Sequence, residues 1–267
     1  MPATPHSHRL ALRFDAAALA ADAAGFAAHE WIPHFNVHHH DGGWSGIALR
    51  APGGDPAKLY PDPDAALPYA QTPHLARCPA VRAVLAALRC PVGSVRFLRL
   101  APGSCIRDHR DYDLSFADGE LRLHVAVTTH PDVEFVLAGE RIEMSPGECW
   151  YLNVNERHRV VNRSAGDRVH LVIDCVADEW LAALLPAELT AASTEARAAF
   201  EAFRARVLAD PALQQTLLGE AEGAHDAASG FVPRVVRTGR AQGFSFGAPE
   251  VLEALRDGRR SRIERWL

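Results

Sequence analysis

The feature that most constrains the fold is a series of short, β-branched segments that starts near residue 94. The segments read VRFLRL, LRLHVAVTTH, VEFVLAGERIEM, CWYLNV, HRVVNRS and RVHLVIDCV, and Gly, Pro, Asn or Asp separate them. Runs of this kind, spaced by roughly 8–15 residues, indicate an antiparallel β-sandwich or barrel. A jelly roll accommodates this many short strands. We therefore expect a mainly β protein with a jelly-roll, cupin-like core.

Helical patterns flank this β-rich region. Residues 15–30 are rich in helix formers and open with a capping Asp15. Residues 79–89 carry apolar side chains at helical spacing after a proline. The stretch between these two helices is dense in Gly and Pro from residue 38 to residue 64, and we expect it to be loop-rich.

After Asp178 the strand pattern ends and helices are expected again. Residues 194–218 read as two helices broken at Asp210-Pro211, and a further helix is expected from Ala248, with Pro249 in its first turn. The chain is therefore expected to contain an N-terminal α/β flank, a β core and a helical satellite, over residues 1–90, 91–180 and 190–267.

Charge and composition exclude several classes of protein. A net charge of −5 gives no argument for nucleic-acid binding. No apolar run approaches the ~18 residues of a membrane span, and the first residues lack the pattern of a signal peptide. The five cysteines are odd in number and show no CxxC spacing, which favours reduced thiols over a disulfide framework or a zinc site. We expect a cytoplasmic protein.

A candidate metal site begins in the run DHRD. His109 and Asp111 are two residues apart, so in an extended backbone both side chains leave the same face of the strand. A second histidine, His158, opens a later strand. Two imidazoles and one carboxylate leave open coordination positions and suit iron(II). Arg168 follows ten residues later, and its guanidinium is suited to a bidentate pair with the far end of a dicarboxylate.

Other residues compete for the role of metal ligand. The HHH run at 38–40 invites a metal interpretation, but adjacent side chains on a strand point to opposite faces, so a loop or strand-edge cluster is preferred. Asp108 would point away from the face that carries His109. Cys105 and Cys149 are expected to be buried thiols.

The segments PGSCIRDHRD, LRLHVAVTTH and FVLAGERIEMSPGECWYLNVNERHRVVNRSAGDRVHLVIDC resemble the aspartyl/asparaginyl β-hydroxylase family. They also resemble its bacterial relatives, among them the proline hydroxylases that carry His-x-Asp. The resemblance implies a double-stranded β-helix, with iron(II) and 2-oxoglutarate as cofactors. It makes His109 and His158 the imidazole ligands and Arg168 the 2-oxoglutarate anchor. The animal enzymes lack the carboxylate ligand, so Asp111 follows the bacterial branch.

The same resemblance assigns Arg122 and His124 to an Arg-x-His element that contacts co-substrate and substrate. His124 is expected beside the distal carboxylate of 2-oxoglutarate, and Arg122 is expected to hold a substrate carboxylate. A polar pair that only braces the barrel is the other interpretation, and the shared strand face of the two residues favours a role in binding. Asp174 also matches a family position and is equally suited to a structural role.

These observations predict a hydroxylase of an amino-acid side chain, free or within a peptide, of the Asp, Asn or Pro type. Its partners would be 2-oxoglutarate and O2, and its co-products succinate and CO2. The alternatives are a non-catalytic cupin-like binding or sensor module, which the intact set of four residues disfavours, and a cupin enzyme that does not use 2-oxoglutarate, which Arg168 disfavours. The helical tail resembles a leader-peptide type of domain. A helical cap over the barrel or a homodimer interface is the preferred interpretation of that tail.

Overall fold

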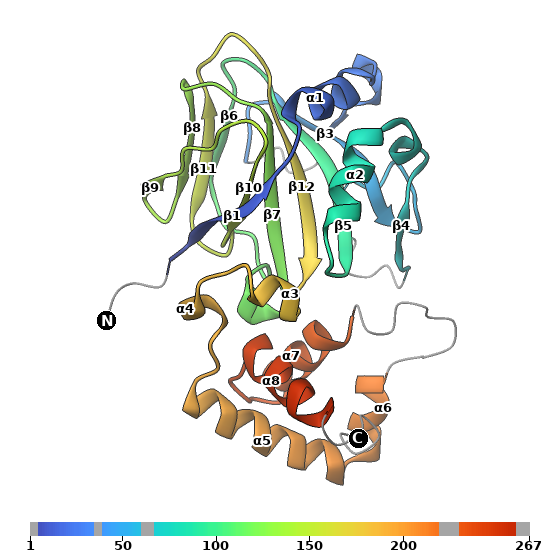
Figure 1. The fold of residues 1–267 in the computed structure, drawn as a ribbon, viewed down its shortest axis with the longest axis vertical. Coiled ribbons are helices and arrows are strands. Elements are labelled where there is room, and N and C mark those ends of the chain that lie inside the picture. Colours follow the sequence, from blue (N-terminus) through green and yellow to red (C-terminus); the bar gives the residue numbers. More distant parts are fainter. Residues whose placement is uncertain (1–4, 35–38, 60–66, 219–229, 260–267) are drawn as a thin grey trace. The chain divides into compact units, whose positions relative to one another are not determined.

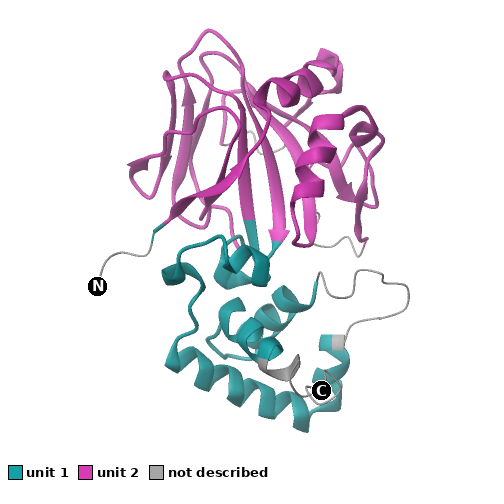
Figure 2. Ribbon diagram, viewed as in Figure 1, with its two compact units in different colours: residues 1–5, 113–121, 176–267 teal, residues 6–112, 122–175 magenta. Residues whose placement is uncertain are grey.

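The computed structural model describes residues 5–34, 39–59, 67–218 and 230–259. Contacts divide the chain into two compact units (Figure 2). The first, here the β unit, comprises His6–Tyr112 and Arg122–Cys175. The second, here the helical unit, comprises residues 1–5, 113–121 and 176–267. The division does not simply follow chain order, because a short segment between two strands of the β unit groups with the C-terminal helices.

The β unit is a sandwich of two antiparallel sheets (Figure 1). The larger sheet has eight strands, ordered β1 (Ser7–Arg13), β10 (Glu148–Leu152), β7 (Glu120–Thr128), β12 (Arg168–Val176), β5 (Val92–Leu100), β3 (Trp44–Pro52) and β2 (Ile32–Pro33), with β4 (Tyr69–Gln71) on β3. The smaller sheet has four strands, ordered β6 (Cys105–His109), β11 (His158–Asn162), β8 (Val133–Leu137) and β9 (Glu140–Arg141). The predicted mainly β, jelly-roll-like fold is confirmed.

The two faces of the larger sheet differ in chemistry. Side chains alternate along a strand, so Arg168, His170 and Asp174 share one face of β12, while Leu171 and Ile173 share the other. All five are buried. A row of buried polar groups on a central strand is costly unless the groups are paired or bind a ligand. This face of the sheet is therefore where a functional site is to be sought.

Short helices accompany the sheets. Helix α1 (Ala16–Ala24) starts where the Asp15 carboxylate accepts a hydrogen bond of 3.0 Å from the Ala18 N–H. It ends at Gly25, earlier than predicted, and a 3-10 turn, η1 (Ala28–Glu30), follows. A second 3-10 turn, η2 (Pro73–Arg77), precedes helix α2 (Pro79–Ala87), which lies where the proline signal predicted it.

One prediction for the N-terminal region was wrong. Residues 44–52, expected to be loop, form strand β3, which pairs with β5 along most of its length. The two glycines before Trp44 and the Pro-Gly-Gly run after Ala51 obscured a strand that is buried at almost every position. Tertiary burial outweighs local propensity here.

The helical unit contains η3 (Phe116–Asp118), α3 (Glu179–Ala182), α4 (Ala187–Thr190), α5 (Thr194–Ala209), α6 (Pro211–Leu218), α7 (Phe231–Ala241) and α8 (Ala248–Arg259). The break at Asp210-Pro211 and the helix at Ala248 are as predicted. The rings of Phe200 and Phe203 lie 5.1 and 5.2 Å from that of Phe246 and form an aromatic core. None of the helices in the described ranges is long and apolar enough to cross a membrane.

Candidate active site

Three potential metal ligands meet at one end of the smaller sheet. His109 is the last residue of β6 and His158 the first of β11, and the two stand opposite each other in the antiparallel ladder. The backbone N–H of Asp111 donates to the Val154 carbonyl at 2.9 Å, which fixes the segment that follows β6. One ligand atom from each side chain lies within 4.8 Å of the other two. The His-x-Asp spacing thus brings both side chains to one point, together with His158.

The hydrogen bonds of the two histidines set which ring nitrogen faces the centre. Nδ1 of His109 lies 2.8 Å from the carbonyl of Arg107, and Nδ1 of His158 lies 2.9 Å from the carbonyl of Glu156. Because a carbonyl oxygen only accepts, each Nδ1 must carry the proton. Both Nε2 atoms are then left with a free lone pair. This is the tautomer that a metal-binding imidazole requires.

The electrostatics keep this cluster ready to bind a cation. Burial, together with the neighbouring His109, lowers the pKa of His158 to about 4. Burial alone would raise the pKa of Asp111, but the neighbouring groups, Arg122 foremost, together outweigh burial and hold that pKa below its ordinary value. At neutral pH the imidazole of His158 is therefore neutral and the carboxylate ionised, as metal ligands must be.

Arg168 lies deeper in the sandwich, at the start of β12. Its Nη2 donates to Nδ1 of His170 at 2.8 Å, and Nδ1 of His170 lies 3.4 Å from Nδ1 of His124. Burial lowers the pKa of Arg168 to about 9. Among the described residues no carboxylate pairs with this guanidinium, and neither its Nε nor Nε2 of His124 has a hydrogen-bond partner. A buried cation in this condition is suited to an anionic ligand.

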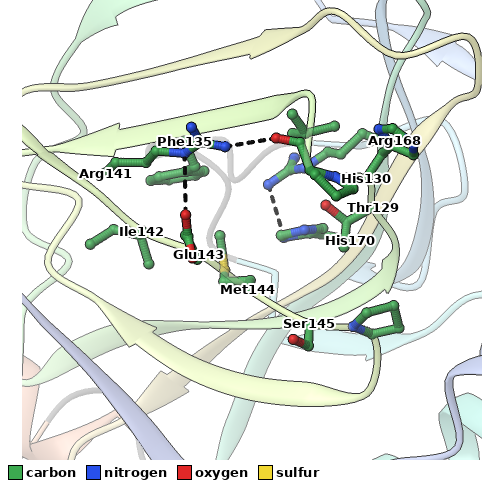
Figure 3. A pocket seen from close by; sticks show the side chains of 13 residues that line it. Thr129, His130, Phe135, Arg141, Ile142, Glu143, Met144, Ser145, Arg168 and His170 are labelled. Carbon is green, nitrogen blue, oxygen red and sulfur yellow. Dashed lines mark hydrogen bonds and ion pairs between the residues drawn. The ribbon is translucent and has the colours of Figure 1, made fainter.

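A pocket of about 310 Å3 opens onto Arg168 and His170 (Figure 3). Its other walls come from the residues after β7, from β8, and from the segment between β9 and β10. Phe135 links it to the metal cluster, because its ring lies parallel to that of His158 at 6.2 Å and 5.8 Å from the Arg168 guanidinium carbon. The Phe135 ring thus lies near both the His109–Asp111–His158 cluster and the buried Arg168 guanidinium.

The sequence profile of the aspartyl/asparaginyl β-hydroxylases matches residues 11–178, well over half of the chain. The chain belongs to the aspartyl/asparaginyl β-hydroxylase family. It is therefore an enzyme of the iron(II)- and 2-oxoglutarate-dependent dioxygenase class, and the resemblance noted in the sequence is confirmed. Two imidazoles, a carboxylate and an unpaired buried guanidinium are the donor set that iron(II) and a dicarboxylate need.

Solved structures with a similar chain trace include enzymes of this class. A prolyl-4-hydroxylase from Pseudomonas putida is 16% identical, with 65% of this chain and 93% of that chain covered, at a TM-score of 0.41. An oxidoreductase of the 2-oxoglutarate-Fe(II) oxygenase family from Burkholderia pseudomallei is 19% identical, with 64% of this chain and 84% of that chain covered, at a TM-score of 0.39. Scores this low carry no argument about the site. The assignment to the hydroxylase family rests on the sequence profile.

The structure places Arg122 differently from the expectation of a guanidinium open to substrate. Its Nε donates to Asp174 Oδ1 at 2.7 Å, its Nη2 to Asp174 Oδ2 at 3.2 Å, and its Nη1 to Oδ2 of Asp111. Arg122 is thus held between two carboxylates of the hydroxylase. Its predicted contact with substrate would have to use the N–H groups that remain.

Two residues of the site were not singled out in the sequence. Arg96 on β5 is 1% exposed and donates to Asp174 at 3.1 Å, and His170 accepts from Arg168. The available signal was strand alternation: Arg96 lies between Val95 and Phe97, and His170 is two residues from Arg168.

The histidine run also lies near the metal cluster. His38 is outside the described residues. The His39 ring lies 5.0 Å from that of His109, whereas Nε2 of His40 lies 3.1 Å from the carbonyl of His34. His39 and His40 therefore differ in their surroundings, in keeping with the opposite directions expected of adjacent side chains. Asp108 is exposed. Cys149 is buried, as predicted, whereas Cys105, which was also predicted to be buried, is only partly buried.

Proposed function

We propose that this chain hydroxylates an amino-acid side chain, free or within a peptide, with iron(II) held by His109, Asp111 and His158. The observation that carries the proposal is the convergence of the three ligand atoms within 4.8 Å while both Nδ1 atoms are committed to backbone carbonyls. Such an arrangement leaves one lone pair per histidine directed at a common point. A hydrogen-bonded surface cluster would not require it.

Arg168 and His124 are the proposed contacts for the distal carboxylate of 2-oxoglutarate. The Arg168 guanidinium supplies a buried positive charge, and its Nε has no hydrogen-bond partner. Nε2 of His124, which also has no partner, can donate to a carboxylate in the tautomer in which it carries the ring proton. Charge-assisted hydrogen bonds of this kind are among the strongest in proteins. His170 holds the Arg168 guanidinium through Nη2, so that the remaining N–H groups face the ligand.

When bound, iron(II) and 2-oxoglutarate activate O2, so that one oxygen atom enters a substrate C–H bond and the other enters succinate as CO2 is released. The side chains of this chain bind, orient and exclude water. Phe135 supplies an apolar wall between the iron ligands and Arg168. The backbone carbonyls of Arg107 and Glu156 keep the rings of His109 and His158 in one tautomer.

Charge supports a substrate that carries a carboxylate. Two buried or half-buried carboxylates, Asp111 and Asp174, face three buried arginines, namely Arg96, Arg122 and Arg168, of which only Arg168 lacks a carboxylate partner. Iron(II) adds two positive charges and 2-oxoglutarate adds two negative ones. The loaded site therefore keeps a net positive charge, which suits the carboxylate of an amino acid or an acidic side chain.

The test is substrate-dependent succinate formation with iron(II) and 2-oxoglutarate, screened over free Asp, Asn and Pro and over peptides that contain them. Hydroxylation adds one oxygen atom to the mass of the substrate. His109→Ala is expected to abolish turnover, and His29→Ala, at an exposed histidine on η1, is the matched control. A protein that binds neither iron nor 2-oxoglutarate would refute the proposal. Binding of both without turnover of any substrate would favour the sensor module.

A further inference from the structure

Four charged side chains form a chain of ion pairs that ends on the proposed metal ligand. Arg96 on β5 donates to Asp174 Oδ2 on β12 at 3.1 Å. Asp174 accepts twice from Arg122 on β7, at 2.7 and 3.2 Å. Arg122 in turn donates to Asp111. Three strands of the larger sheet thereby connect to a carboxylate that belongs to the segment after β6 on the smaller sheet.

The two oxygens of Asp111 have different surroundings. Oδ2 accepts from Nη1 of Arg122. Oδ1 lies 3.9 Å from Nε2 of His109, on the side where the ligand atoms converge. Since Arg122 occupies one oxygen, the other is the one free to bind a metal. The contact thus selects a single oxygen and orients it, as the carbonyls of Arg107 and Glu156 do for the two imidazoles.

Arg122 is itself unable to turn. All three of its guanidinium nitrogens donate to carboxylates, and two of the contacts form a fork on Asp174. Asp174 is fixed in the same way, because it lies between Arg122 and Arg96, and all three side chains are buried. Removing one partner of a buried ion pair leaves an uncompensated buried charge, which strongly destabilises the fold. The chain therefore has one stable arrangement.

We propose that Arg122, held by Asp174, is a positioning residue that presents Asp111 to the metal as a one-oxygen ligand. This inference rests on the proposed iron site and adds to it a supporting pair, Arg122 and Asp174, that acts on a metal ligand. Outer hydrogen-bond partners of metal ligands typically change metal affinity by about 10–100-fold when they are removed. The pair should therefore act on metal binding even when neither 2-oxoglutarate nor substrate is present.

Two variants separate orientation from charge. Arg122→Lys keeps the positive charge but cannot form the fork. Asp174→Asn keeps the shape of the anchor but weakens its hold on Arg122. The matched control is Arg159→Lys, because Arg159 lies on β11 next to His158 and pairs with Glu134 at 2.8 Å on the surface, away from any ligand.

The experiment is titration of the full-length, metal-free protein with Co(II), followed by calorimetry and by the visible absorption of the bound ion. We expect Arg122→Lys and Asp174→Asn each to weaken Co(II) binding by about 10–100-fold and to change the absorption spectrum. Arg159→Lys should stay within about twofold of the unchanged protein. Circular dichroism establishes that each variant is folded. If Asp174→Asn fails to fold, Arg122→Lys carries the test because it retains the buried charge.

The outcomes distinguish this inference from the proposed function. If the unchanged protein binds Co(II) and His109→Ala does not, but Arg122→Lys binds like the unchanged protein, Arg122 does not position Asp111 and the inference is overturned. If Arg122 contacts only the substrate, Arg122→Lys also leaves Co(II) binding unchanged, and it changes only the KM for substrate. If the unchanged protein binds no Co(II), the proposed iron site itself fails.

Discussion

Two arginines of the site show how surroundings decide what a residue does. Arg122 is buried, which by itself lowers its pKa, but the carboxylates of Asp174 and Asp111 outweigh burial and raise the pKa above its ordinary value. Arg168 is equally buried without such a partner, and its pKa is lowered to about 9. The first guanidinium is part of the structure of the site. The guanidinium of Arg168 is buried at a cost in the free energy of unfolding and is suited to binding an anion.

The cost of burying the Arg168 guanidinium without a carboxylate partner gives a prediction for the Arg168→Met variant. Methionine is similar in length to arginine but has no charge. We expect the KM for 2-oxoglutarate to rise by about 100-fold or more, because the charge-assisted contacts are lost. The free energy of unfolding should be unchanged or higher by roughly 1 kcal/mol, because a buried unpaired charge is removed. Urea denaturation of the ligand-free protein measures the second effect. A fall in stability of several kcal/mol would show that the guanidinium is structural.

At the scale of elements, the segment between the metal ligand and β7 belongs to the helical unit. Arg240 on α7 donates to Asp113 at 2.7 Å and to Asp118 at 2.6 Å. Asp118 also accepts from the Ser115 hydroxyl and backbone N–H. At Gly119, with φ of +88°, an added Cβ would lie 2.8 Å from the Pro233 Cα. Residues 113–121 therefore join the C-terminal helices to the stretch of chain between Asp111 and Arg122.

The close approach at Gly119 predicts a large effect of Gly119→Ala. Both the positive φ and the contact with the Pro233 backbone oppose a side chain, and together they should lower the free energy of unfolding by about 2–4 kcal/mol. Gly139→Ala is the matched control, because Gly139 has φ of +87° but nothing within 4 Å of the added Cβ. Its cost should be near 1 kcal/mol. Equal losses for the two variants in denaturant unfolding would contradict the proposed packing of Gly119 on α7.

At the scale of the whole molecule, buried histidines make stability depend on pH. Burial lowers the pKa of His34 to about 3 and lowers the pKa values of His124 and His170 well below their ordinary value. In the unfolded chain these groups take up protons near pH 6.5. Protonation therefore favours the unfolded state, so stability is greatest above pH 6.5 and falls as the pH drops below it.

We expect the free energy of unfolding of the metal-free protein to fall between pH 7 and pH 5. The slope approaches at most about 1.4 kcal/mol per pH unit for each buried histidine. His170→Gln should reduce the slope by up to about 1.4 kcal/mol per pH unit, because it removes one of these buried histidines. Urea denaturation at several pH values measures both slopes. A free energy that is the same at pH 7 and pH 5 would contradict the burial of neutral histidines.

Local sequence patterns determined much of the fold. Strands β5, β7, β8, β10, β11 and β12 follow from β-branched runs bounded by turn residues, whereas β6 lies outside those runs. Helices α2, α5, α6 and α8 follow from proline and apolar spacing. Strand alternation predicted that His109 and Asp111 lie close together. They do, although β6 ends at His109 and Asp111 lies in the segment after it. Strand β3 did not follow, because its burial comes from neighbours that are distant in sequence. The family resemblance rests on motifs that are also local.

Only the tertiary structure decided which partner each charged side chain has. Arg122 and Arg168 both look like anion-binding residues on inward strand faces, but Asp174 and Asp111 reach only the first. Arg96 and Asp174 are 78 residues apart and meet because β5 and β12 are neighbours. The physical reason is that ionisation and orientation depend on distances between side chains in space, and strand register, rather than local pattern, sets those distances.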